Sequence, residues 1–175
     1  PEPVPEADVL LVESTYGDRL HPPDPIEELA RVINAGVARG GAIIVPAFAV
    51  GRTQELLWYL RKLEDDNRIP ILPVYIDSPM ALEVTEIYSR HTREHNVPLT
   101  QLQAETGCAI QTRRQMMIHT VDESKMLNTI EGPMIVIAGS GMATGGRVLH
   151  HLTRRLADER TTILLPGYQA EGTRG

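Results

Sequence analysis

The sequence predicts one α/β domain in three layers, a mainly parallel sheet with helices on both faces. Short apolar runs rich in β-branched residues alternate with helical patterns, and turn residues mark the borders between them. The length of 175 residues and the hydrophobic content of 42% suit a single core and leave little room for a second one.

Five apolar runs are predicted strands. Each is short, mainly apolar and bounded by turn residues, which is typical of strands buried on both faces of a parallel sheet. The predicted strands cover 8–13, 42–46, 71–77, 134–139 and 162–167, and residues 116–121 are a further candidate that precedes a capped helix.

Helical patterns fill the gaps between these runs. The first begins with Asp24 as N-cap and Pro25 at its first position, and Gly40 ends it. The second spans 51–66 and the third spans 78–95, each with apolar residues along one side. Because right-handed crossovers join parallel strands through such helices, the sequence predicts a Rossmann-like fold.

Charge and composition narrow the classes of function. A net charge of −6 argues against a protein that holds nucleic acid over its whole surface, so an anionic partner must be bound locally. No signal peptide or long apolar span is evident, so we expect a cytoplasmic protein without a membrane partner. The single cysteine, Cys108, has no partner for a disulfide or a metal site and is assigned no role.

The loops after the predicted strands carry the polar residues of interest. In an open parallel sheet the ligand crevice lies beyond the carboxyl ends of the strands. Four of the five loops combine glycine with arginine, at Arg19, Arg52, Arg147 and Arg174, and this combination fits an anion such as phosphate. For any single loop the plainer interpretation is a turn glycine and a solvated arginine, so the hypothesis needs the loops to share one edge.

Nucleotide and zinc motifs are absent. The glycines of loop 139–147 are spaced one residue too far for a dinucleotide fingerprint, and no Gly-Lys-Ser/Thr loop is present. His91 and His95 lack a third ligand, and His150 and His151 lie about 100° apart around a helix, so the sequence predicts no zinc site.

Two acids end predicted strands. Glu13 is followed by Ser-Thr-Tyr-Gly, where it could accept hydrogen bonds or orient a histidine, and the alternative is an acid that caps its own loop. Asp77 has the same ambiguity, because it precedes a helix that it could simply cap.

Five motifs stand in order along the chain: VESTYGDRLH, GGAIIVPAFAVGRTQELL, VYIDSPMA, VIAGSGMATGGRVLHHL and GYQAEGTRG. In order and spacing they resemble the β-CASP family of metallo-β-lactamase-fold nucleases. That family includes RNA-processing exonucleases, ribonuclease J and the endonuclease of eukaryotic mRNA 3′-end formation. The resemblance extends from about Ala7 to Gly175.

The resemblance implies a Rossmann-like cap inserted in a metallo-β-lactamase domain, with nucleic acid between the two. Residues 1–20 would lead out of that domain through motif A, 21–165 would form the β-CASP domain, and 166–175 would return. The motif A acid falls on Glu13, where it would support a catalytic histidine without binding the metal. The residues implied to face RNA are Arg52, Ser140, Gly141, Arg147, Gln169 and Thr173.

The family's zinc ligands are missing from this chain. Its H-x-H-x-D-H motif would precede motif A and its later histidines would follow the last motif, and neither is present. The chain therefore resembles the cap of a longer protein. Two zinc ions and hydrolysis of RNA phosphodiester bonds would belong to the full-length protein, and the cap alone would be inactive. Expected partners are RNA, the chain's own metallo-β-lactamase domain and a second copy in a homodimer.

Two other classes of function stay open on the sequence alone. One is a Rossmann-like nucleotide-binding domain of a transferase or dehydrogenase, although the glycine spacing argues against it. The other is a nucleic-acid-binding module without catalytic activity. The residues do not decide between RNA and DNA, or between exonuclease and endonuclease.

Overall fold

A sheet of five parallel strands forms the centre of the protein. The computed structural model describes residues 6–20, 24–91, 94 and 110–175. The strands lie in the order β3-β2-β4-β1-β5 and each pairs in parallel with its neighbours. Their bounds are Ala42–Pro46 for β1, Val74–Asp77 for β2, Gln115–Met117 for β3, Met134–Ala138 for β4 and Thr162–Ile163 for β5.

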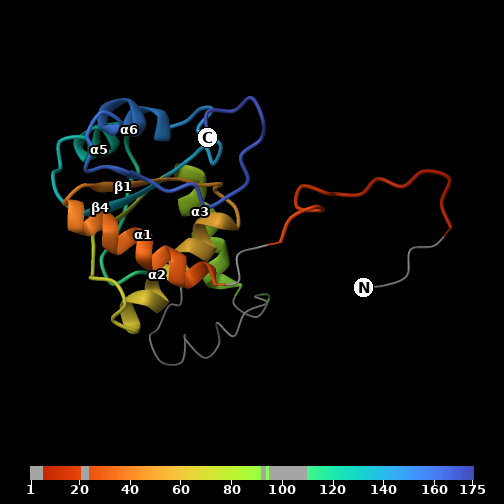
Figure 1. The fold of residues 1–175 in the computed structure, drawn as a ribbon, viewed down its shortest axis with the longest axis horizontal. Coiled ribbons are helices and arrows are strands. Elements are labelled where there is room, and N and C mark those ends of the chain that lie inside the picture. Colours follow the sequence, from red (N-terminus) through yellow and green to blue (C-terminus); the bar gives the residue numbers. More distant parts are fainter. Residues whose placement is uncertain (1–5, 21–23, 92–93, 95–109) are drawn as a thin grey trace.

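Helices cover both faces of this sheet, as the sequence predicts (Figure 1). On one face lie α1 (Pro25–Arg39), α2 (Arg52–Asp65) and α3 (Pro79–Arg90), and on the other lie α5 (Val121–Leu127) and α6 (Val148–Arg155). Alternate residues of one strand enter the two cores: Ile43 packs with the first set of helices and Ile44 with the second. The three-layer α/β fold is therefore confirmed.

The chain connections on the two sides of β4 run over opposite faces of the sheet. The strand β1 leads into α2 on one face of the sheet, and its neighbour β4 leads into α6 on the opposite face. The other neighbour of β4, β2, leads into α3 on the same face as α2. At such a point the loops leave the carboxyl edge in opposite directions and open a crevice between them.

The predicted helix ends are largely confirmed. The Asp24 side chain accepts a hydrogen bond of 2.9 Å from the Glu27 N–H at the start of α1. Gly40 ends this helix with φ 73°, a left-handed conformation that costs glycine little. The third helix is shorter than predicted because it ends at Arg90, and His95 lies outside the described residues.

The predicted strand at 8–13 is wrong. These residues form no strand, and they leave the body of the protein as an extended arm (Figure 1). Their side chains are exposed, Leu11 to 93%, because no neighbouring strand covers them. An apolar run indicates a tendency toward burial but does not supply the partner strand that a parallel ladder requires.

Other strands are shorter than the sequence indicates. Of the predicted runs at 71–77 and 162–167, only Val74–Asp77 and Thr162–Ile163 join the sheet. The candidate at 116–121 is β3, shifted to Gln115–Met117, and α5 follows it with a capping box between Thr120 and Glu123. Within the described ranges, no helix is both long enough and apolar enough to cross a membrane.

Candidate functional site

Three of the predicted loops meet in a hollow of about 370 Å³ at the carboxyl ends of β1, β2 and β4. We call it the switch-point hollow, because it lies where the chain connections reverse. Its lining comes from residues 47–49 after β1, from 77–80 at the end of β2, and from 139–141 and 146–147 after β4. The predicted convergence of these three loops is confirmed.

Arg147 lines the switch-point hollow, and hydrogen bonds within the protein hold its side chain in place. Its Nη1 donates a hydrogen bond of 2.7 Å to Asp77 Oδ1, and its guanidinium also donates to the carbonyl oxygens of Ile118 and His119 at 3.4 and 3.3 Å. The side chain is 20% exposed. Three contacts to fixed acceptors would be rare for a solvated arginine, so this side chain is oriented by the fold.

Asp77 is the centre of a buried polar network. Its Oδ2 accepts hydrogen bonds from Ser124 Oγ at 2.5 Å and from His151 Nε2 at 2.6 Å, while Nδ1 of that histidine lies 3.1 Å from Asn128 Oδ1. Burial raises the pKa of Asp77, but hydrogen bonds from His151, Ser124 and Arg147 outweigh it and hold that pKa below its usual range. The carboxylate is therefore ionised and satisfied.

The network resolves the ambiguity of Asp77. The cap of α3 is Ser78, whose hydroxyl accepts from the Ala81 N–H at 3.4 Å, so Asp77 is not a capping acid. Sequence reasoning missed Ser124 and His151 as its partners. A signal was present for the histidine, because His151 lies three residues after the buried Val148 on the core side of α6.

The glycine loop 139–147 is closed largely on itself. Ser140 Oγ accepts hydrogen bonds from the N–H groups of Thr144 and Gly145 at 3.1 and 3.2 Å. Within the described part of the chain, the N–H groups of Gly141 and Gly146 have no acceptor, and both residues line the switch-point hollow. The loop therefore offers an anion fewer free N–H groups than its number of glycines indicates.

Close packing explains two of these glycines. A Cβ on Gly141 would lie 2.7 Å from Cδ2 of Phe48, and a Cβ on Gly146 would lie 2.4 Å from the Gly139 carbonyl oxygen. Gly141 also accepts a hydrogen bond of 2.9 Å from Gln169 Nε2 through its carbonyl oxygen. This contact ties the C-terminal segment to the loop.

Arg52 and Gln169 line a neighbouring and larger hollow of about 830 Å³, between α1, α2 and residues 164–169. We call it the tyrosine hollow, because Tyr16, Tyr59 and Tyr168 also line it. Arg52 is paired with Glu55 at 2.6 Å and its side chain is 30% exposed. Thr173, also predicted to face RNA, donates its hydroxyl to the Ala170 carbonyl at 2.6 Å and so closes its own turn.

Glu13 and Arg174 lie away from the switch-point hollow. Glu13 is exposed on the arm, and its carboxylate accepts a hydrogen bond of 2.7 Å from the Thr15 N–H. Hydrogen bonds from the side chain and the backbone of Thr15 lower the pKa of Glu13. Arg174 lines a different hollow, beside α6 and β5. The expectation that the loops share one edge is therefore wrong for Glu13, whereas the hollow of Arg174 includes Pro46 at the end of β1 and Ala143 of the glycine loop. The support of a histidine by Glu13 stays a prediction.

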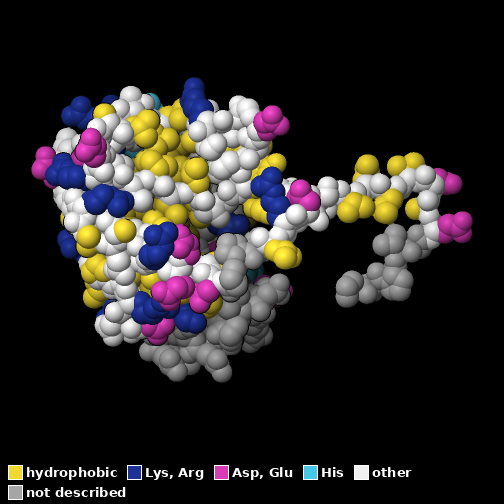
Figure 2. Space-filling view, in the orientation of Figure 1, with side chains coloured by type: hydrophobic (Ala, Val, Ile, Leu, Met, Phe, Trp, Pro, Cys, Tyr) yellow, Lys and Arg dark blue, Asp and Glu magenta, His cyan; other side chains and the backbone are white. Residues whose placement is uncertain are grey.

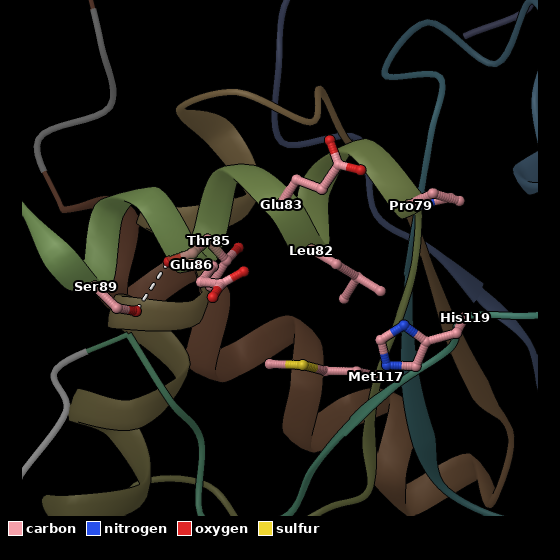
Figure 3. Close-up of a pocket in the computed structure, with 8 residues that line it drawn as sticks. All are labelled: Pro79, Leu82, Glu83, Thr85, Glu86, Ser89, Met117 and His119. Atoms are coloured by element: carbon pink, nitrogen blue, oxygen red, sulfur yellow. Dashed lines mark hydrogen bonds between the residues drawn. The ribbon is translucent and has the colours of Figure 1, made fainter.

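The described residues do not form a metal centre. Across 6–20, 24–91, 94 and 110–175, no group of three His, Cys, Asp or Glu side chains could hold an ion. The hollow between α3 and β3 contains both acids and a histidine, but Glu83 points away from the His119 ring, and Leu82 and Met117 fill the space between α3 and β3 (Figure 3).

A comparison with known protein families shows to which family this chain belongs. The model of the Beta-Casp domain matches residues 53–175, well over half of the chain. The chain belongs to the β-CASP family. The resemblance of its five motifs is thereby confirmed.

Two of three curated proteins similar to this β-CASP chain are named as ribonucleases or as RNase J-like, and the third as a transcription termination factor. A ribonuclease of Thermus thermophilus is 38% identical over 173 residues, which are 98% of this chain and 40% of that protein. An RNase J-like protein of Methanocaldococcus jannaschii is 32% identical, covering 97% of this chain and 39% of the relative. A transcription termination factor of Methanosarcina mazei is 32% identical, and the match covers 98% of this chain and 28% of the relative. The β-CASP chain thus spans about two fifths or less of these relatives.

Asp77→Asn should destabilise the β-CASP domain, because it removes the charge that faces Arg147 in a buried site. Breaking a buried pair in this way costs about 3–5 kcal/mol, which denaturant unfolding at neutral pH would measure. The matched control is Asp158→Asn, which breaks a more exposed pair with Arg160 and should have a much smaller effect on unfolding.

The difference between wild type and Asp77→Asn should depend on pH. Since folding lowers the pKa of Asp77, its stabilisation is present above the usual aspartate pKa of about 3.9 and is lost as the pH falls through the folded value. The two unfolding free energies should therefore approach one another in acid. A constant difference across this range would contradict the assigned ionisation.

Gly141→Ala should disturb the switch-point hollow of the β-CASP domain, because the new methyl group would overlap the Phe48 ring. Overpacking of this kind costs about 1–3 kcal/mol in unfolding free energy. Gly145→Ala is the control, since a Cβ there meets nothing within 4 Å. Equal stability of the two variants would show that Phe48 moves aside without cost.

Proposed function

We propose that this chain is the β-CASP part of a ribonuclease and that the switch-point hollow receives the sugar-phosphate backbone of RNA. The observation that carries the proposal is the reversal of chain connections beside β4, which brings loop 139–147 and Arg147 to one carboxyl edge. The ribonuclease and RNase J-like names of two relatives support RNA as the substrate class.

The hollow offers the groups that bind phosphate oxygens. Gly141 and Gly146 have N–H groups without an acceptor in the described part of the chain. Arg147 adds a positive charge that its contacts with Asp77 hold in place, and Arg52 stands in the adjoining tyrosine hollow. Such contacts position a strand but do not select its bases.

Hydrolysis is assigned to the remainder of the full-length protein. The described residues do not fit a metal site, so two zinc ions would be bound by a metallo-β-lactamase domain outside this chain. There Glu13 would support a catalytic histidine. We further propose a cytoplasmic protein that forms a homodimer, with residues 1–20 and 166–175 joining the β-CASP domain to the catalytic one.

Family membership removes one of the earlier alternatives. A β-CASP domain is not the nucleotide-binding domain of a transferase or dehydrogenase. The second alternative, a nucleic-acid-binding module without activity, is distinguished by measuring hydrolysis of single-stranded RNA by the full-length protein. If the full-length protein bound RNA but did not cleave it, the result would favour that module.

Arg52→Gln in the full-length protein should weaken RNA binding in a salt-dependent manner. Removing one phosphate contact should reduce the slope of log affinity against log salt by about 0.7 for a single strand. Fluorescence anisotropy with a labelled RNA oligonucleotide would measure it. Arg90→Gln is the matched control, because Arg90 forms a comparable helix-surface pair with Glu86 at the far end of α3. Identical slopes for both variants would remove Arg52 from the site.

Glu13→Ala in the full-length protein should lower RNA hydrolysis by about 10- to 100-fold, as expected when an acid that orients a metal ligand is lost. Zinc content, measured by atomic emission, should be kept. Unchanged cleavage rates would show that the motif A acid has no part in the reaction.

A further inference from the structure

Tyrosine side chains are concentrated in the tyrosine hollow. Three of the five tyrosines of the chain line it. Tyr16 and Tyr168 meet edge to face, with ring centroids 5.9 Å apart and ring planes at 78°. The guanidinium carbon of Arg19 lies 5.6 Å from the centre of the Tyr168 ring. Aromatic rings with an arginine beside them are the elements that bind unstacked bases in single-stranded nucleic acid.

The charges around this hollow nearly cancel. Arg19 and Arg52 line it together with Glu28 and Glu55. Glu55 is paired with Arg52, and Glu28 is paired with Arg31. Apart from the contact proposed for Arg52, attraction of phosphate therefore gives little affinity here. The ring faces and the aliphatic side chains beside them favour a flat ligand with an apolar face and a polar edge.

The tyrosine hollow adjoins the switch-point hollow. A Cβ on Gly167 would lie 3.6 Å from the Phe48 ring of one hollow and 3.9 Å from Arg52 Nε of the other. Gln169 lines the tyrosine hollow while its amide donates to the Gly141 carbonyl oxygen in the glycine loop. A strand with its backbone in the first hollow would reach the second by way of this shared wall.

The space in the tyrosine hollow is sufficient for a base. Its volume of about 830 Å³ exceeds that of the switch-point hollow, about 370 Å³, and lies in the usual range for sites that hold small ligands. Its lining combines apolar side chains with basic and acidic ones.

We propose that the tyrosine hollow binds an unstacked base of the RNA strand whose backbone lies in the switch-point hollow, with Tyr168 as the stacking ring. This inference depends on the proposed function and adds a second, base-binding site to it. Since every base has a π face, the site would be tolerant of sequence but selective for single strands over duplexes.

The test uses the full-length protein and a labelled single-stranded RNA. Tyr168→Leu keeps an apolar side chain but removes the ring, and it should weaken binding roughly 5- to 150-fold, as loss of one stacked base does. Tyr168→Phe should retain wild-type affinity, because the ring and not the hydroxyl stacks. Tyr88→Leu is the control, since Tyr88 lies on α3 and lines neither hollow.

Salt dependence separates stacking from phosphate contacts. Tyr168→Leu should leave the salt slope of binding unchanged, whereas loss of a phosphate contact would reduce it. An RNA with an abasic residue at the stacked position should bind the wild type and Tyr168→Leu equally. A weakening that persists with the abasic RNA would overturn the proposal, because it would then arise from altered packing of the chain ends.

A direct optical test covers the case in which Tyr168→Leu does not fold. RNA oligonucleotides carrying 2-aminopurine at successive positions should show a stacking-dependent fluorescence change at one position when wild-type protein binds. Binding without such a change at any position would overturn the base site but leave the proposed function intact. Failure of wild-type protein to bind RNA at all would instead contradict the proposed function.

Discussion

The buried carboxylate of Asp77 is the constraint on which the carboxyl edge of this sheet depends. A charge removed from water is stable only when its oxygens are fully paired, and here Ser124, His151 and Arg147 supply the donors. These three partners come from α5, α6 and the residue that begins α6. One side chain at the end of β2 therefore fixes the position of two helices and the end of the glycine loop.

The same constraint limits what the edge can do. Arg147 and Ser140 are held by contacts within the protein, so both are oriented before a ligand arrives. Binding at this edge then depends on a small number of oriented groups in a rigid setting. Groups that are already ordered lose little conformational entropy when a partner binds. A moderately charged but rigid hollow can therefore bind a partner without a flexible basic surface. The overall charge of −6 is consistent with that arrangement.

Local signals in the sequence predict most of the fold but less of the site. The runs at 42–46 and 134–139 are both strands, because continuous apolar residues are buried on both faces of the sheet. The run at 8–13 has the same pattern but lacks a neighbour. The partners of Asp77 lie 47 to 74 residues away, and Gly141 is required by the ring of Phe48. Contacts of this range are set by the order of the strands, which no local pattern records.

The arm has a consequence for the chain taken by itself. Val9, Leu10, Leu11 and Val12 are between 61% and 93% exposed, and they follow one another without a charge between them. Figure 2 shows their side chains in the open, away from the body of the molecule. Consecutive aliphatic residues with unpaired backbone groups promote intermolecular β pairing. In the chain taken by itself, intermolecular pairing would therefore begin at residues 9–12 rather than at the buried strands of the sheet.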